Sequence, residues 1–122
     1  METTVQNHEQ LQYAEVYISD MLSLKNIFLQ SQNLSGLNQD FGLPFLLAKK
    51  KNKVLAFASL VINEKGEISF KIHGKNRLTD TEKQNFTFQA EKYFRKNNTA
   101  NFRNTEQLKS SISRMVGWQT IG

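Results

Sequence analysis

The chain has 122 residues and a formal net charge of +5, and 39% of its residues are hydrophobic. These values predict a single domain over residues 1–122 with a modest hydrophobic core. The absence of cysteine excludes disulfides, thiolate nucleophiles and sulfur-ligated metal sites.

The charge is distributed unevenly along the chain. Residues 1–48 contain one Lys against five acidic residues, a net charge of −4, whereas residues 49–122 contain 15 basic residues against six acidic ones, a net charge of +9. A basic half of this size attracts phosphate backbones or the acidic surface of a protein. The same Lys content is also typical of an ordinary solvated surface, so both interpretations stay open.

The N-terminal segment shows no targeting signal. Residues 1–10 have no basic start followed by an apolar run, and no apolar stretch of the chain approaches the roughly 20 residues that a membrane-spanning helix needs. We therefore expect a soluble, unsecreted, cytoplasmic protein that does not bind a membrane.

Apolar residues recur at steps of three or four between His8 and Gln32, which is typical of an amphipathic helix. Asp20 or Ser23 could cap a second helix within this stretch, so the pattern is compatible with one long helix or with two shorter ones. Residues 33–44 contain two Gly and the only Pro of the chain, and they are predicted to form a loop that leads into the sheet.

Three consecutive strands are predicted to form a meander at the centre of the fold. Residues 45–48 are a short apolar run, and residues 54–62 are apolar on both faces, which is typical of a central strand. Residues 68–73 alternate between apolar and polar side chains, which indicates a half-exposed neighbouring strand. Residues 63–66 provide the turn between the last two strands.

The hairpin tip between the first two strands carries the densest positive charge in the chain, on Lys49, Lys50, Lys51 and Lys53. These side chains could contact phosphates, although lysines at turns and sheet edges also protect a protein from aggregation. Basic residues appear again directly after the third strand.

The C-terminal half contains the clearest helix, over residues 79–96, because Thr79 and Glu82 fit a capping box. Residues 99–103 are predicted to form a short strand, residues 105–116 a helix with Gly117 at its C′ position, and residues 118–121 a last strand. The whole order predicts an α+β fold, in which an N-terminal helix or helices and two C-terminal helices flank a mostly antiparallel sheet.

Two segments carry a resemblance to a known family. PFLLAKKKNKVLAFASLVIN resembles the second and third strands of the acyl-CoA N-acyltransferases of the GNAT superfamily, and ISRMVGW resembles their closing helix. Ile112, Val116, Gly117 and Trp118 match the pattern of that helix, and the resemblance covers roughly residues 10–122. It implies an acyltransferase-like fold and, in an active member, acetyl-CoA-dependent N-acyl transfer.

The chain departs from that family where the chemistry takes place. The family's pyrophosphate loop carries glycines that let backbone amides approach the phosphates, whereas residues 75–80 here contain none, and Asp80 would place a carboxylate nearby. Lys75 and Arg77 could substitute in part by ion pairing. The family's frequent catalytic Tyr falls on Ser113, whose hydroxyl is too weak an acid for that proton transfer. The resemblance therefore implies that catalysis is absent.

Other site chemistry receives little support from the sequence. His8 and His73 are the only histidines, they lie far apart, and neither has a metal-binding motif around it. No Walker loop, dinucleotide-binding glycine motif, nucleophile elbow or paired-carboxylate motif occurs. We therefore expect no catalytic residue, no cofactor and no metal.

The leading hypothesis is a small, basic, non-catalytic binding protein that inhibits or modulates a nucleic-acid-handling machine, such as an anti-CRISPR-like inhibitor of an RNA-guided nuclease. Its partner would be a nucleoprotein, a nuclease with its RNA, or an acidic protein surface. The expected contacts are Lys49, Lys50, Lys51, Lys53, Lys75 and Arg77. One alternative is an acetyl-CoA-dependent N-acyltransferase with an atypical phosphate loop. Another is a subunit of a larger assembly, which predicts an exposed apolar patch.

Overall fold

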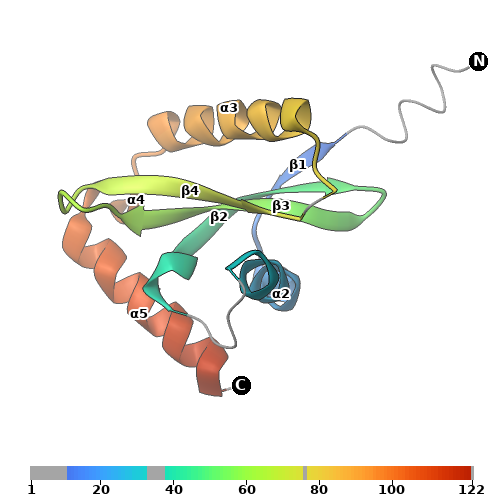
Figure 1. Ribbon diagram of the computed structural model, residues 1–122. Coiled ribbons are helices and arrows are strands. Elements are labelled where there is room, and N and C mark those ends of the chain that lie inside the picture. Colours follow the sequence, from blue (N-terminus) through green and yellow to red (C-terminus); the bar gives the residue numbers. More distant parts are fainter. Residues whose placement is uncertain (1–10, 33–37, 76, 122) are drawn as a thin grey trace, which may run out of the picture.

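The computed structural model describes residues 11–32, 38–75 and 77–121, with side chains described as far as Trp118. Its sheet has four antiparallel strands in the order of the sequence (Figure 1). They are β1 (Gln12–Glu15), β2 (Leu43–Lys50), β3 (Lys53–Ile62) and β4 (Ile68–Gly74). The predicted three-strand meander is confirmed, and one further strand extends it at the β2 edge.

Helices cover both faces of this sheet. They are α2 (Met21–Gln32), α3 (Asp80–Lys96), α4 (Ala100–Arg103) and α5 (Thr105–Ile121), with single 3-10 turns at η1 (Ile18–Asp20) and η2 (Gln39–Phe41). In Figure 1, α3 lies on one face, α2 lies on the other, and α5 runs past one end of the sheet. The predicted α+β fold is therefore confirmed. No helix in the described part of the chain is long and apolar enough to cross a membrane.

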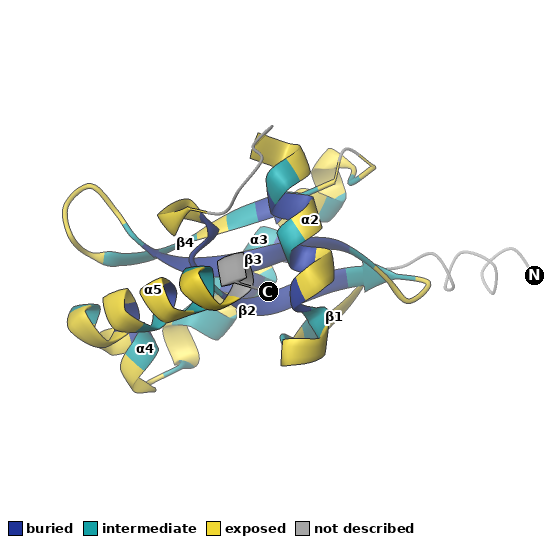
Figure 2. Cartoon of the chain, turned by 90° about the horizontal axis from the view of Figure 1, so that it is seen from below, coloured by how far each residue is buried: buried dark blue, intermediate teal, exposed yellow. Residues whose placement is uncertain are grey.

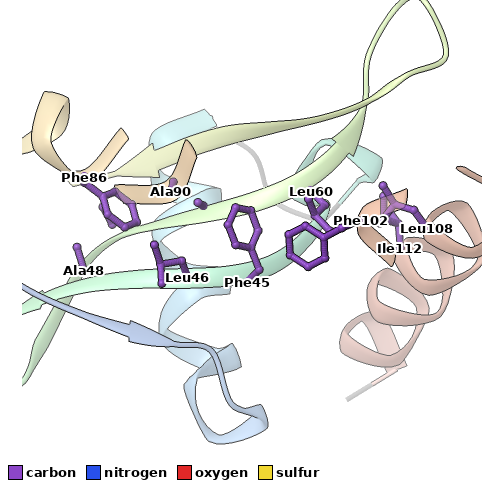
Figure 3. Packing of buried hydrophobic residues seen from close by; sticks show 11 residues of the cluster. Phe45, Leu46, Ala48, Leu60, Phe86, Ala90, Phe102, Leu108 and Ile112 are labelled. Atoms are coloured by element: carbon purple, nitrogen blue, oxygen red, sulfur yellow. The ribbon is translucent and has the colours of Figure 1, made fainter. Parts of the chain in front are cut away.

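The core on the α3 face is built from small sheet residues and large helix residues. Ala48, Ala56 and Ala58 leave room on the sheet surface, and the ring of Phe86 is fully buried there. Figure 3 shows that Phe45 and Leu60 carry the same cluster towards α4 and α5. Because one continuous cluster joins the sheet to these three helices, its burial holds the C-terminal half on the sheet.

The core on the α2 face is aromatic. Met21, Leu24, Ile27 and Phe28 recur along one side of α2 and pack on the sheet, where Phe57 is fully buried. Strand β3 is thus covered on both faces, as its sequence predicts, and it appears as the buried middle of the sheet in Figure 2. A strand of this kind is the most protected element of an open sheet.

A bulge interrupts the β2–β3 ladder close to the hairpin. Ala48 is paired with Ala56 and Lys49 with Val54, so Leu55 has no counterpart on β2. Val54 consequently packs with the α2-side cluster, whereas Ala56 faces α3. In an uninterrupted strand Val54 would lie on the same face as Ala56, whereas the extra residue Leu55 moves Val54 to the other face.

The helix predicted from residue 8 is wrong at its start, because Gln12–Glu15 form β1, and His8 lies outside the described residues. The second helix allowed by the sequence is α2. Spacing alone fits a helix at this point, but β1 gains ladder hydrogen bonds by pairing with β2. Leu11 then packs on the α3 side and Ala14 on the α2 side.

Two predicted C-terminal strands are also wrong. Residues 99–103 contain the short helix α4, and α5 continues through Gly117 to Ile121. A helical turn buries Phe102 in the core, where its ring lies 5.3 Å from that of Phe45. Asn104 then accepts a hydrogen bond from the backbone of Gln107 at the start of α5, at 2.9 Å. Gly117 costs the helix only about 1 kcal/mol relative to Ala, which is too little to stop it.

Candidate anion-binding surface

Three of the six predicted contact residues converge on one hollow of about 350 Å³. We call it the basic hollow, and its lining consists of Ile27, Gln30, Ser31, Lys53, Leu55, Gly74, Lys75 and Arg77. The wall from α2 contributes neutral side chains, and the ends of β3 and β4 contribute the cations. The hollow therefore depends on three segments that are distant in the sequence.

Backbone hydrogen bonds place the cations in this hollow. The amide of Lys75 donates to the carbonyl of Leu55 at 2.9 Å, which continues the β3–β4 ladder beyond Gly74. The amide of Leu78 then donates to the carbonyl of Lys75 at 3.2 Å and closes a turn that contains Arg77. The side chains of Lys75 and Arg77 therefore lie near the beginning of β3, where Lys53 is the first residue of the strand.

Lys49 and Lys51 extend the positive charge from the basic hollow along the hairpin. Lys49 is paired with Val54, and because paired residues of adjacent strands share a face, Lys49 also lies on the α2 side. Lys51 and Asn52 occupy the exposed hairpin tip, with φ values of 52° and 67°. These are the left-handed conformations that a two-residue hairpin turn requires.

Lys50 lies on the opposite face of the sheet. Its Nζ is 2.7 Å from Oε2 of Glu82 at the start of α3, and both side chains are partly buried. The positive charge of Lys50 is therefore compensated by Glu82 within the protein. The structure therefore places Lys50 away from the basic hollow.

The N-terminus of α3 is occupied by its own capping box. Thr79 Oγ1 accepts from the backbone of Glu82, and Glu82 Oε1 accepts from the backbone of Thr79, both at 3.0 Å. Hydrogen bonding from Lys50 holds the pKa of Glu82 below its usual value, so this carboxylate stays ionised. Since Asp80 adds a second acidic side chain in the same turn, the helix end disfavours a further anion.

His73 belongs to the core. Its ring lies 5.2 Å from that of Phe28 and 5.1 Å from that of Phe57, and burial lowers its pKa. The described residues contain no group of three or more His, Asp or Glu side chains that could hold a metal ion. A neutral, enclosed imidazole of this kind is a packing residue.

A second surface is apolar and was not located from the sequence. Ile18 and Trp118, which are 77% and 56% exposed, line one hollow, and Tyr17 and Leu22, the chain neighbours of its lining residues Ile18 and Met21, are exposed as well. We call these four residues, together with the adjacent hollow of about 400 Å³, the apolar patch. The hollow is lined by Ile18, Met21, Leu43, Ser111, Arg114, Met115 and Trp118. Ile18 and Leu22 belong to the apolar residues that recur at steps of three or four between His8 and Gln32, but η1 and α2 leave both side chains exposed.

Comparison of the chain with models of protein families, with curated proteins and with solved structures found no match in any of the three. No family is therefore assigned, and the resemblance to the N-acyltransferases stays a prediction. The basic hollow and the apolar patch are therefore the features from which we infer a function.

Proposed function

We propose that this protein is a small, non-catalytic binding protein that holds the phosphate backbone of a nucleic acid, free or within a nucleoprotein. The observation that supports the proposal is the convergence of Lys53, Lys75 and Arg77 on one hollow. Lys49 and Lys51 enlarge the same positively charged surface.

The chemistry of the basic hollow suits a phosphate group. None of its described lining residues is acidic, so the three cations attract an anion without an internal competitor. The guanidinium of Arg77 can donate two parallel hydrogen bonds to one phosphate, and a lysine ammonium can act as a point charge beside it. Because no aromatic side chain lines the hollow for base stacking, we expect recognition of the backbone rather than of a sequence.

A protein of this kind would act by occupying RNA or the protein surface around it. A chain of 122 residues with a net charge of +5 has the size and charge that we expect of an anti-CRISPR-like inhibitor of an RNA-guided nuclease. Bound to the nucleoprotein, it would cover phosphates that the nuclease needs for its own contacts. This proposal places the protein in the cytoplasm with its target.

Fluorescence anisotropy with a labelled single-stranded RNA and a labelled duplex RNA tests the proposal. The variant with Lys53→Gln, Lys75→Gln and Arg77→Gln should bind at least tenfold more weakly. Its affinity should also depend less steeply on salt, by about one unit of slope for each phosphate that the protein no longer neutralises. The matched control replaces Lys65, Lys83 and Lys96 with Gln, which removes the same charge elsewhere on the surface. Equal weakening of RNA binding in the two variants would mean that only net charge matters and would contradict the proposal.

The basic hollow also supports the alternative of acyl-CoA binding. Lys75 and Arg77 belong to the segment that corresponds to the family's pyrophosphate loop, and both line the hollow. Calorimetry with acetyl-CoA distinguishes the two functions. Micromolar binding that is lost with Lys75→Gln and Arg77→Gln, in a protein that does not bind RNA, would favour the N-acyltransferase.

A further inference from the structure

The outer edge of β4 is the longer of the two open edges of the sheet. The strand order ends at β4, and no described segment is paired with its far side. Strand β4 has seven residues, no Pro and no bulge, whereas the opposite edge strand, β1, has four residues. Open edges of this length are usually shortened, bulged, covered or charged in proteins that do not use them, and within β4 Lys71 is the one charged residue of this kind.

The ladder shows which backbone groups point outwards. At one end the amide of Asn63 donates to the carbonyl of Glu67 at 2.8 Å, and at the other end the amide of Lys75 donates to the carbonyl of Leu55 at 2.9 Å. Hydrogen-bonded pairs of an antiparallel ladder recur at every second residue, and the pairing between these two ends has no register shift.

Between those ends, the odd-numbered residues Ser69, Lys71 and His73 bond to β3. The N–H and C=O groups of Phe70 and Ile72 therefore point away from the sheet. A strand that approached this edge would find donors and acceptors at the correct spacing to continue the ladder.

Side chains next to the edge form a hollow of about 480 Å³ on the α3 face. Its lining consists of Ile68, Ser69, Phe70, Glu91, Phe94, Arg95 and Arg103. The rings of Phe70 and Phe94 lie 5.4 Å apart and provide an apolar floor. Nε of Arg95 donates to Glu91 at 2.9 Å, whereas the guanidinium of Arg103 donates only to the carbonyl of Arg95, so its charge has no carboxylate partner among the described residues.

The other side of the same edge carries charges of both signs, because a hollow there is lined by Lys65 and Lys71 and also by Asp40, Glu64 and Glu67. Lys71 is exposed, and its Nζ lies 3.9 Å from the carboxylate of Asp40, which is also exposed. Such a pair contributes little and is readily exchanged. An incoming strand would therefore meet an apolar floor with Arg103 on one face and Lys71 on the other.

We propose that the β4 edge binds an extended segment of a partner protein in which apolar and acidic residues alternate. Successive side chains of a strand point to opposite faces, so the apolar residues would cover Phe70 and Phe94 while the acidic residues approach Lys71. A second copy of this chain fits less well, because β4 contains no acidic residue that could face Lys71. This peptide site is separate from the basic hollow and does not depend on the proposed function.

Hydrogen exchange measured by NMR on the unmodified protein tests the backbone part of the proposal. In the protein alone, the amides of Phe70 and Ile72 should exchange much faster than those of Ser69, Lys71 and His73. Addition of an eight-residue peptide with alternating Val and Glu should slow Phe70 and Ile72 by at least tenfold. Protection of these two amides before any peptide is added would mean that the edge is already covered, and would overturn the proposal.

Two control peptides separate strand addition from simple charge attraction. One has the same composition with Val and Glu in two blocks, and the other has Lys in place of Glu. Both should bind at least tenfold more weakly in fluorescence anisotropy, because the first lacks the two-residue period and the second has the wrong charge. Equal binding of the block peptide would overturn the proposal.

Two substitutions at one position provide the matched variants. Ile72→Pro removes an outward N–H without taking a hydrogen bond from the β3 ladder, whereas Ile72→Ala keeps that N–H and loses the side chain. Only Ile72→Pro should abolish peptide binding, in proteins shown to be folded by circular dichroism. If light scattering instead shows that Ile72→Pro dissociates a dimer of this chain, the occupant is a second copy and the proposed partner is wrong.

Discussion

Lys50 and Glu82 form an ion pair, with 2.7 Å between Nζ and Oε2, that joins the β2–β3 hairpin to the first turn of α3. The same carboxylate accepts the backbone N–H of Thr79 in the capping box. One side chain thus fixes both the start of the helix and its position over the sheet. It also explains why Lys50, in the most lysine-rich segment of the chain, is directed towards α3.

Glu82→Gln should destabilise the protein by about 1 kcal/mol at pH 7, since the amide can still cap the helix but cannot pair with Lys50 as an anion. The pKa of Glu82 is lowered in the folded state. Its contribution is therefore present above the unfolded pKa, near 4.5, and is lost as the pH falls through the folded value. Urea unfolding at pH 7 and pH 3 should show the difference between the two proteins shrinking at pH 3. Glu64→Gln, in an exposed turn, is the control and should behave like the wild type.

His73 should also make stability fall as the pH decreases, but here the folded state favours the neutral form of the side chain and not the charged one. Burial between Phe28 and Phe57 lowers its pKa below the usual 6.5; among the smaller effects, Asp40 raises the pKa and Lys71 lowers it further. The unfolded imidazole therefore takes up a proton near pH 6.5, while the folded one does so only at lower pH. The stabilising contribution of neutral His73 should be fully present above about pH 6.5 and should be lost as the pH decreases from there to the folded pKa.

Urea unfolding between about pH 7.5 and pH 5 checks this dependence. In His73→Phe an aromatic ring still fills the site but nothing titrates there, so the free energy of unfolding should be flatter over the same range. His8 is present in both proteins and cancels from the comparison. Parallel pH profiles would show that burial of His73 does not govern the slope.

The elements that local sequence signals predicted are those in which local and tertiary preferences agree. Residues 54–62 are apolar on both faces because β3 is covered by α2 and α3. The capping box of Thr79 and Glu82 is a contact within one turn, so the spacing of the two residues in the sequence is enough to predict it. Both features could be predicted without knowledge of the rest of the fold.

The elements that were predicted wrongly depend on partners elsewhere in the chain. Gln12–Glu15 form a strand because the edge of β2 is available, and the helical spacing around Ala14 carries no information about that edge. Residues 99–103 turn as a helix because this buries Phe102 against Phe45. Tertiary pairing and packing decide such short segments.

The same difference between local sequence signals and tertiary pairing applies to the candidate site. The sequence identified the cations and grouped Lys50 with Lys53. The two are partners in the β2–β3 ladder, but Lys53 lines the basic hollow whereas Lys50 is paired with Glu82 of α3. The convergence of Lys53 with Arg77 requires the β3–β4 register and the position of α2. The extra residue at Leu55 also changes the face of the sheet on which the hairpin side chains lie, and no local sequence pattern predicts this bulge.

Gly42 and Gly66 should respond differently to the same substitution. Both have positive φ, of 69° and 79°. A Cβ on Gly66 would meet open space, so Gly66→Ala should cost about 1–2 kcal/mol, the penalty for a left-handed residue. A Cβ on Gly42 would overlap the carbonyl oxygen of Leu60 and lie 2.9 Å from Cγ1 of Val61, so Gly42→Ala should cost more than about 3 kcal/mol. Thermal unfolding of the two variants checks the order, which a larger loss of stability at Gly66 would contradict.

The apolar patch leads to a prediction about assembly. The sequence-based hypothesis of a subunit in a larger assembly requires an exposed apolar surface, and Ile18, Leu22 and Trp118 are all more than half exposed. Arg114 lies among them, and no described carboxylate is paired with it. Exposed aromatic and aliphatic side chains next to an arginine are typical of the centre of a protein interface.

Light scattering at increasing concentration should therefore give a mass above the 14.1 kDa of the single chain. Trp118→Ser should weaken this association by about 2 kcal/mol or more, roughly thirtyfold, because a tryptophan at an interface centre often contributes that much. Phe88→Ser removes an aromatic side chain that is 62% exposed on α3, outside the apolar patch, and should leave the mass unchanged. If the wild type and the Trp118 variant are both monomeric throughout, the patch does not join copies of this chain. If Phe88→Ser and Trp118→Ser weaken association equally, the effect is general surface hydrophobicity and not a defined interface.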